Sequence, residues 1–167
     1  LLARAGWASK DWSQTYESAR ASLGIDAQQP EMHFTAAMAG QQLERWDEAR
    51  QHLEKAIELR DDPRDHMFYA NLLIQREQWN EAARHARRTI AMAPGAEMAH
   101  AMLAKIAANR GDHGEALQHI NRAIGSLDEQ TLNRAVKLRR LHIQKVQYLK
   151  QTGRTGDAIN ILTALPS

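Results

Sequence analysis

The chain has 167 residues, of which 43% are hydrophobic and 25% are charged, and its formal net charge is +2 at pH 7. This composition excludes a disordered or collagen-like chain, and only 9 Gly and 4 Pro residues argue against a loop-rich all-β domain. The absence of Cys excludes disulfides, thiolate metal sites and cysteine nucleophiles.

Residues that lose little conformational freedom in a helix are abundant, with 28 Ala beside many Leu, Glu, Arg and Gln. We therefore predict an all-α protein. No apolar stretch approaches the roughly 18 residues that a membrane span needs, and the N-terminus lacks a signal-peptide pattern. We expect a soluble protein, cytoplasmic rather than periplasmic, and its Ala- and Arg-rich, Lys-poor composition suggests a bacterial source.

Ten helices are predicted from the apolar spacing and from the helix-stopping residues that separate them. In chain order they span 1–9, 11–23, 30–43, 46–59, 63–76, 79–92, 96–109, 113–125, 127–152 and 155–164. The ninth is predicted to be long because Thr131 to Leu138 contain no Gly or Pro and add about two turns. Ser126 and Glu129 form a predicted capping box at its start.

A short pattern recurs along the chain, as in Trp-Asp-Glu-Ala at 46–49 and Trp-Asn-Glu-Ala at 79–82. Its last position, the anchor, falls at spacings of 34, 33, 34 and 42 residues, at Thr15, Ala49, Ala82, Ala116 and Ala158. Small residues also recur twelve before and seven after most anchors, and aliphatic residues recur eight after. Small side chains at fixed helical positions let two helices approach closely, so each period predicts a helical hairpin.

These residues resemble the tetratricopeptide repeat family, whose 34-residue helix-turn-helix unit has the pattern W-x2-L-G-x2-Y, A-x3-F and P. The chain departs from this pattern where His replaces the family Trp and where the final Pro occurs only as Pro94. The resemblance implies an all-α, right-handed superhelical stack of about five hairpins, an α-solenoid, as one domain over 1–167. Its repeats would span roughly 1–29, 30–62, 63–96, 97–130 and 131–167. Because the chain opens inside a helical pattern without an initiating Met, we expect a fragment of a longer protein.

Seven of the eight histidines occupy only two positions of the repeat. His33, His66, His100 and His142 lie sixteen residues before an anchor, and His52, His85 and His119 lie three after one. Copies in successive repeats are too far apart to share an ion, and no pair has i, i+4 spacing. We interpret the histidines as half-buried packing residues and predict no metal site and no cofactor.

No catalytic constellation is visible, because the sequence lacks a Ser/His/Asp arrangement, a Gly-rich phosphate loop and an isolated acidic pair. Trp12, Trp46 and Trp79 lie three residues before their anchors, where packing at the hairpin turn is expected rather than stacking on a sugar or a base. We predict that the chain is not an enzyme.

The resemblance implies that the first helix of each repeat lines a concave groove that binds a peptide segment or partner protein. The predicted partner-binding residues are Phe34, Met38, Met67, Asn71, Ile74, Met98, Lys105, Arg139 and Arg140. Methionine suits a groove that accepts peptides without rigid shape matching. Charge is divided along the chain, with a net −3 over 1–100 and a net +5 over 101–167. We interpret the basic C-terminal part first as a solvated face, and docking of an acidic segment of a partner is the alternative.

Two other functions stay open. The chain is alternatively a regulatory or substrate-positioning module of a larger enzyme such as a glycosyl- or sulfotransferase. The basic helix predicted at 127–152 alternatively binds nucleic acid, which is less favoured because no aromatic residues interleave with its cations. The sequence does not indicate an oligomeric state.

Overall fold

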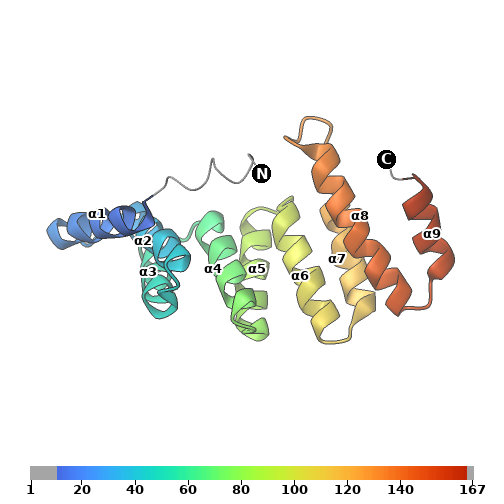
Figure 1. Cartoon of the computed structure of the whole chain (residues 1–167), viewed down its shortest axis with the longest axis horizontal. Coiled ribbons are helices and arrows are strands. Elements are labelled where there is room, and N and C mark those ends of the chain that lie inside the picture. Colours follow the sequence, from blue (N-terminus) through green and yellow to red (C-terminus); the bar gives the residue numbers. More distant parts are fainter. Residues whose placement is uncertain (1–10, 165–167) are drawn as a thin grey trace. The chain divides into compact units, whose positions relative to one another are not determined.

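The computed structural model describes residues 11–164, which form nine α-helices and no strand (Figure 1). The helices are α1 (Trp12–Ile25), α2 (Pro30–Gln42), α3 (Trp46–Leu59), α4 (Pro63–Gln75), α5 (Trp79–Met92), α6 (Glu97–Asn109), α7 (His113–Gly125), α8 (Arg134–Gln151) and α9 (Thr155–Ala164). The predicted all-α class is confirmed. Within 11–164, no helix combines the length and the apolar character needed to cross a membrane.

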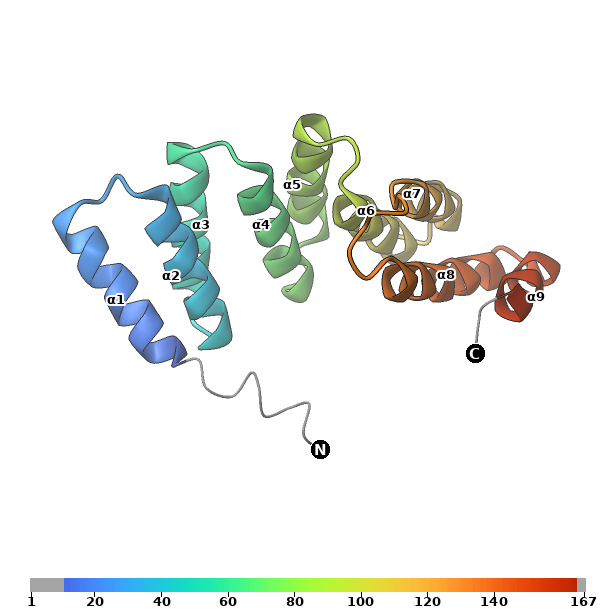
Figure 2. The same ribbon diagram turned by 90° about the horizontal axis from the view of Figure 1, so that it is seen from above.

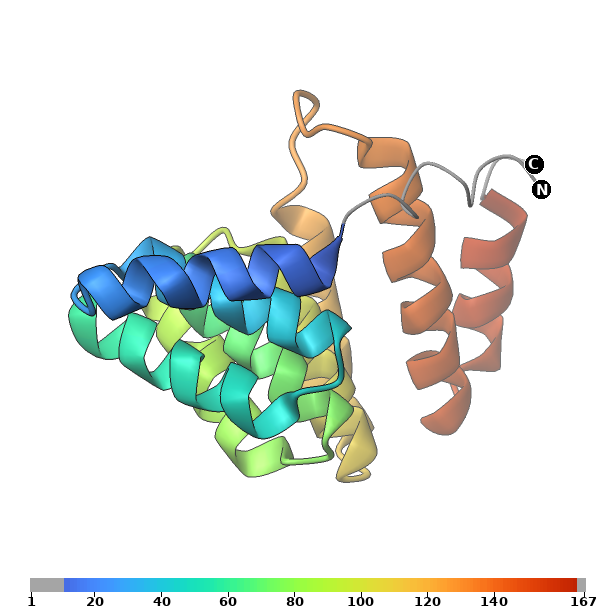
Figure 3. The same cartoon turned by 60° about the vertical axis from the view of Figure 1, so that its left-hand side comes forward.

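The chain divides into two compact units that meet inside α4, between Tyr69 and Ala70. Unit 1 holds α1, α2, α3 and the first half of α4, and unit 2 holds the remainder. Within unit 1, α1 packs on α2 and α2 on α3 (Figure 2). Within unit 2, α5 packs on α6, α6 on α7, α7 on α8 and α8 on α9, the last pair being clearest in Figure 3. The predicted single domain over 1–167 stays a prediction.

The turns that close the hairpins share one backbone conformation. A residue five before each of the last four anchors adopts a left-handed conformation, with φ of 59° at Glu44, 57° at Glu77, 82° at Gly111 and 74° at Gly153. The next residue donates its N–H to a carbonyl five residues back, as Arg45 does to Gly40 at 2.8 Å. The same bond joins Gln78 to Leu73, Asp112 to Ala107 and Arg154 to Leu149, at 2.9 to 3.0 Å. This is the hydrogen bond that closes a Schellman motif. The same backbone turn therefore recurs with the period of the sequence repeat.

The anchor residues lie where two helices of a hairpin come closest. Ala49, Ala82 and Ala116 are fully buried, and Ala158 is 2% exposed. A Cβ added to Gly40 would lie 3.4 Å from the Cβ of Ala49, so α2 and α3 are nearly in backbone contact there. The prediction that small residues permit close helix packing is therefore supported between α2 and α3.

The long helix predicted at 127–152 is wrong at its N-terminal end, because α8 begins only at Arg134 and residues 126–133 form a loop. The Ser126 hydroxyl donates to the Ala123 carbonyl (2.9 Å), which leaves the predicted capping box unformed. The Thr131 hydroxyl donates to the Asp128 carboxylate (2.6 Å), and Asn133 adopts a left-handed φ of 57°. Local hydrogen bonds of Ser, Thr and Asp thus compete with the helix.

The remaining described boundaries agree with the prediction to within two residues, and α1 continues through Gly24 to Ile25. Helix α8 still has 18 residues against 13 in α2, α4 and α6, so part of the insertion lengthens the helix. The helix predicted at 1–9 lies outside the described residues.

Replacing Gly111 by Ala is expected to lower the free energy of unfolding by about 1 kcal/mol, because L-residues disfavour a left-handed backbone. Nothing lies within 4 Å of the added Cβ, so the cost is conformational. Replacing Glu77 by Gly should raise the free energy of unfolding by up to about 1 kcal/mol for the same reason. Urea unfolding measures both changes.

The control for this comparison is Gly125→Ala, at the end of α7, where the backbone is not left-handed and the added Cβ also meets nothing within 4 Å. This variant should be neutral or more stable than the parent. A loss there as large as that of Gly111→Ala would contradict the conformational explanation.

Candidate functional site

The predicted partner-binding residues are distributed over both units. In unit 1, Phe34, Met38 and Met67 are half-buried on α2 and α4. In unit 2 lie Asn71 and Ile74 of α4, Met98 and Lys105 of α6, and Arg139 and Arg140 of α8. Ile74 is only 7% exposed and belongs to the core, so its predicted place in a groove is not supported.

Phe34 is half-buried and contacts two neighbouring side chains. Its ring lies 5.2 Å from the ring of Phe68, centroid to centroid, in an edge-on arrangement. The Arg64 guanidinium lies 4.3 Å from the centroid of the Phe34 ring, in a cation–π contact. Unit 1 therefore presents an aromatic side chain beneath a partly exposed cation.

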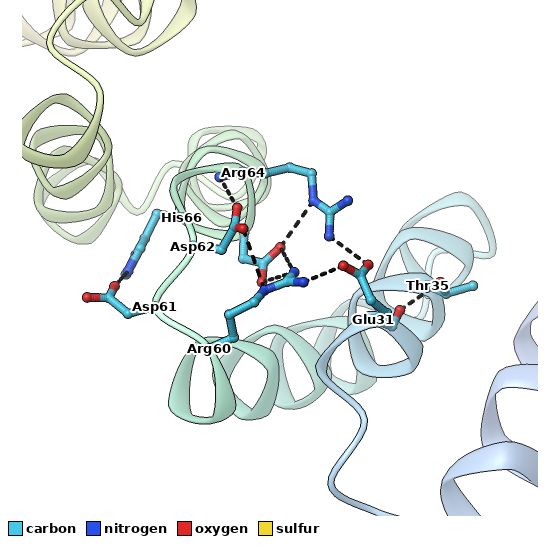
Figure 4. Close-up of polar contacts among 8 residues, drawn as sticks. Glu31, Thr35, Arg60, Asp61, Asp62, Arg64 and His66 are labelled. Carbon is cyan, nitrogen blue, oxygen red and sulfur yellow. Dashed lines mark hydrogen bonds and ion pairs between the residues drawn. The ribbon is translucent and has the colours of Figure 1, made fainter.

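A cluster of charged residues holds Arg64 in this position (Figure 4). Arg64 donates from Nη2 to Glu31 of α2 at 2.8 Å, and Glu31 also pairs with Arg60, which directly follows α3. Arg60 Nη2 in turn lies 2.9 Å from Oδ2 of Asp65, near the start of α4. This clamp of Glu31, Arg60, Arg64 and Asp65 joins three helices of unit 1.

The carboxylates of the clamp differ in burial. Asp65 is fully buried and accepts from Arg60 through both oxygens, at 2.9 and 3.2 Å. Glu31 is largely exposed, and hydrogen bonds from Arg60 and then Arg64 hold its pKa below the ordinary value. The only sequence signal for the clamp is the dense run of charge at 60–65, across the break between two helices.

A second buried carboxylate, Glu97, joins α6 to α8 in unit 2. Glu97 is 8% exposed and lies 2.7 Å from Arg140 and 3.3 Å from Lys137. Arg140 is therefore already paired, whereas Arg139 and Lys105 have no ion pair within residues 11–164. The sequence analysis missed this contact, because Glu97 and Arg140 are 43 residues apart.

Histidines of one hairpin contact each other, which the sequence analysis did not foresee. The Nδ1 atoms of His33 and His52 are 3.0 Å apart, between α2 and α3. The same atoms of His100 and His119 are 3.3 Å apart, between α6 and α7. The two positions are 19 residues apart within a repeat, so they face each other across the hairpin.

Backbone carbonyls determine which nitrogen carries the proton. Nε2 of His33 lies 3.1 Å from the Ala27 carbonyl, and Nε2 of His100 lies 3.3 Å from the Pro94 carbonyl. Each of these Nε2 atoms must donate, so in the neutral rings Nδ1 accepts from the histidine of the second helix. The pairs are therefore satisfied without a metal, and residues 11–164 contain no group of three His, Asp or Glu side chains arranged to hold one.

Replacing the buried Asp65 by Asn is expected to lower the free energy of unfolding by about 2 kcal/mol. Breaking a buried ion pair costs about 3–5 kcal/mol, and the 30% exposure of Arg60 reduces that cost because water solvates the freed guanidinium. Urea unfolding measures the change. Glu58→Gln is the matched control, since the Lys55–Glu58 pair (3.0 Å) leaves Glu58 69% exposed, and it should cost less than about 0.5 kcal/mol. Equal losses would contradict a structural role for the clamp.

The histidine pairs should make the protein less stable in mild acid. Burial, the largest cause, lowers the pKa values of His52, His100 and His119 below the ordinary 6.5. Since the unfolded chain then binds protons at higher pH than the folded one, the free energy of unfolding falls as pH drops below 6.5. Urea unfolding between about pH 7.5 and about pH 5.5 measures this dependence.

His119→Asn should reduce that pH dependence, because Asn retains an N–H donor but does not take up a proton in this range. Gln118→Asn is the control, at an exposed residue of the same helix that has no titratable group, and it should leave the pH dependence unchanged. If both variants behaved alike, the pairs would not be the source of the acid sensitivity.

The fold resembles several solved structures of low sequence identity. MamA has a TM-score of 0.80 at 14% identity, over 92% of this chain and 85% of that chain. A chain of the APC/C hetero-tetramer Cut9-Hcn1 has a TM-score of 0.76 at 16% identity, over 92% of this chain and 29% of its own length. PilF of Pseudomonas aeruginosa has a TM-score of 0.66 at 15% identity, over 86% of this chain and 68% of that chain. No curated protein sequence matches this chain significantly.

Family models are more specific than these structural similarities. Two models, each described as a tetratricopeptide repeat, match residues 30–63 and 69–130. Together they cover more than half of the chain and include α2 to α7. The chain therefore belongs to the tetratricopeptide repeat family.

Proposed function

We propose that the chain is a protein-binding scaffold that holds peptide segments of its partners on the first helices of its hairpins. The proposal is supported by family membership, because arrays of such hairpins present extended binding surfaces. The neighbours MamA and PilF have the same fold at low identity, and the function proposed here does not rest on theirs.

The observation that carries the proposal is the chemistry of the side chains that remain accessible on α2, α4 and α6. Alanine is the commonest residue of the buried core, and larger flexible side chains lie at the surface of these helices. Met38 and Met67 are half-buried, and Met98 is 41% exposed. Methionine adapts its shape to different apolar partners, which suits recognition of a peptide.

The two units offer different chemistry. Unit 1 presents Phe34 beneath Arg64, together with Met38 and Met67, so its contribution to binding is largely apolar. Unit 2 presents Met98 and Lys105 of α6 with Arg139 of α8, whereas Arg140 is paired with Glu97, so the contribution of unit 2 is cationic. We infer that apolar and charged parts of a partner are read by separate parts of the chain.

Replacing Phe34 by Ala is expected to weaken peptide binding about fivefold or more, which corresponds to about 1 kcal/mol at an anchor residue. Met67→Ala should act similarly, and neither effect should depend strongly on salt, because the contacts are apolar. Peptides selected from a random phage-displayed library against the purified chain supply the ligands, and calorimetric titration measures their affinities.

The matched control is Ile57→Ala on α3, a half-buried aliphatic residue of a second helix in the same unit. It removes a comparable packing contact away from the proposed surface, so affinity should be unchanged. Failure to select any peptide, or an equal loss in the Ile57→Ala variant, would refute binding through the first helices.

A further inference from the structure

One side of α8 combines exposed apolar side chains with unpaired cations. Val136 is 70% exposed and Ile143 is 45% exposed, and their spacing of two helical turns places them on the same side. Arg139 and Lys150 lie on that side as well, by the same helical spacing. We call these four residues the α8 face.

The cations of the α8 face form no ion pair with the described part of the chain. Within residues 11–164, neither Arg139 nor Lys150 forms an ion pair, whereas Lys137 and Arg140 of the same helix both pair with Glu97. Helix α8 contains no acidic residue. Its outward charge is therefore left for a ligand or for solvent.

The α8 face rests on a packed support rather than on a loose terminal helix. On the opposite side, Leu141 is fully buried and Leu149 is 1% exposed, in a core shared with α6, α7 and α9. The contacts of Lys137 and Arg140 with Glu97 also hold the N-terminal half of α8 to α6. The exposed side chains of the α8 face are therefore held on a fixed support.

We propose that the α8 face docks an acidic peptide segment of a partner protein. Carboxylates of the segment pair with Arg139 and Lys150. One apolar side chain between them packs on Ile143, and a second one beyond Arg139 packs on Val136. From Val136 to Lys150 the helix rises about 21 Å, which an extended segment of about six residues spans. This inference rests on the proposed scaffold function and adds the chemistry of the partner that unit 2 selects.

Glu97 gives an internal example of the same recognition. Its carboxylate reaches α8 from α6 and accepts a hydrogen bond from Arg140 at 2.7 Å. Met98, the next residue, is 41% exposed. An acidic residue beside an apolar one therefore already lies against the cations of α8.

Two other classes of macromolecule fit the α8 face less well. Single-stranded nucleic acid binds by stacking bases on aromatic side chains, and the aromatic residue of α8, Tyr148, is 8% exposed. A membrane-surface helix separates an apolar side from a charged side, whereas Arg139 lies on the same side as Val136 and Ile143. The peptide is the partner that uses both the charges and the apolar side chains.

The test uses the whole chain and a fluorescein-labelled peptide, Glu-Glu-Leu-Ser-Leu-Glu-Glu, in anisotropy titrations at low and high salt. Arg139→Glu is expected to weaken binding about tenfold at low salt and less at high salt, because exposed charges act through a screened field. Ile143→Ser should weaken binding about threefold at both salt concentrations, because the contact that it removes is apolar.

Two variants serve as matched controls, and thermal melting verifies that every variant is folded. Arg122→Glu makes the same change of charge at an exposed site on α7, and Ile159→Ser removes a similarly exposed aliphatic side chain, 54% exposed, on α9. Both should bind the peptide as the parent does. A peptide with Gln in place of every Glu should bind at least about tenfold more weakly.

Three results would overturn the proposal. The first is no binding of the acidic peptide, and the second is equal binding of the Gln peptide. The third is binding of single-stranded DNA or of phosphatidylglycerol vesicles that is stronger than binding of the peptide and is lost in Arg139→Glu, which would assign the α8 face to another class of ligand. If the library still yielded peptides that depend on Phe34, the scaffold function would stand while this inference failed.

Discussion

The close approach of two helices at the hairpin turns is the constraint on which the other features depend. A left-handed residue at 44, 77, 111 or 153 reverses the chain, and a bond from the following N–H closes each turn. The helices then leave the turn so close together that Gly40 and Ala49 nearly touch. Only small side chains fit between the two helices at this point, and larger side chains such as His33 and His52 contact each other farther along the same two helices.

The helices were predictable because their signal is local and repeated. The anchor spacing and the breaks at Pro30, Pro63 and Gly125 place most boundaries within two residues. The loop at 126–133 was not predictable from the same rules, because it contains no Gly or Pro and depends on short-range hydrogen bonds such as Thr131 to Asp128. Many segments that are not helical contain the residues of a capping box. Competing side-chain hydrogen bonds determine whether such a segment forms a helix or a loop.

The sequence predicted which helices carry the candidate residues, but it did not predict what those residues contact. The repeat spacing assigned Phe34 and Arg140 to first helices. It gave no indication that Arg64 covers Phe34 or that Glu97 pairs with Arg140. Those contacts join residues 30 and 43 positions apart, and they depend on how neighbouring repeats pack. The histidines illustrate the same limit, since comparing equivalent positions between repeats concealed the contact of His33 with His52 inside one repeat.

In the two histidine pairs the donor and the acceptor are not interchangeable. This constrains the design of a consensus repeat from this chain. The first-helix histidine donates a hydrogen bond from Nε2 to the carbonyl of Ala27 or Pro94, so its Nδ1 is an acceptor at neutral pH. The second-helix residue therefore has to donate to that Nδ1. In the last hairpin Ile161 occupies the second-helix position, and the buried Nδ1 of His142 has no hydrogen-bond partner in the described part of the chain. A designed array that copied His142 and Ile161 into every unit would multiply a buried ring nitrogen without a hydrogen-bond partner, whereas one that copied His100 and His119 would give that nitrogen its partner.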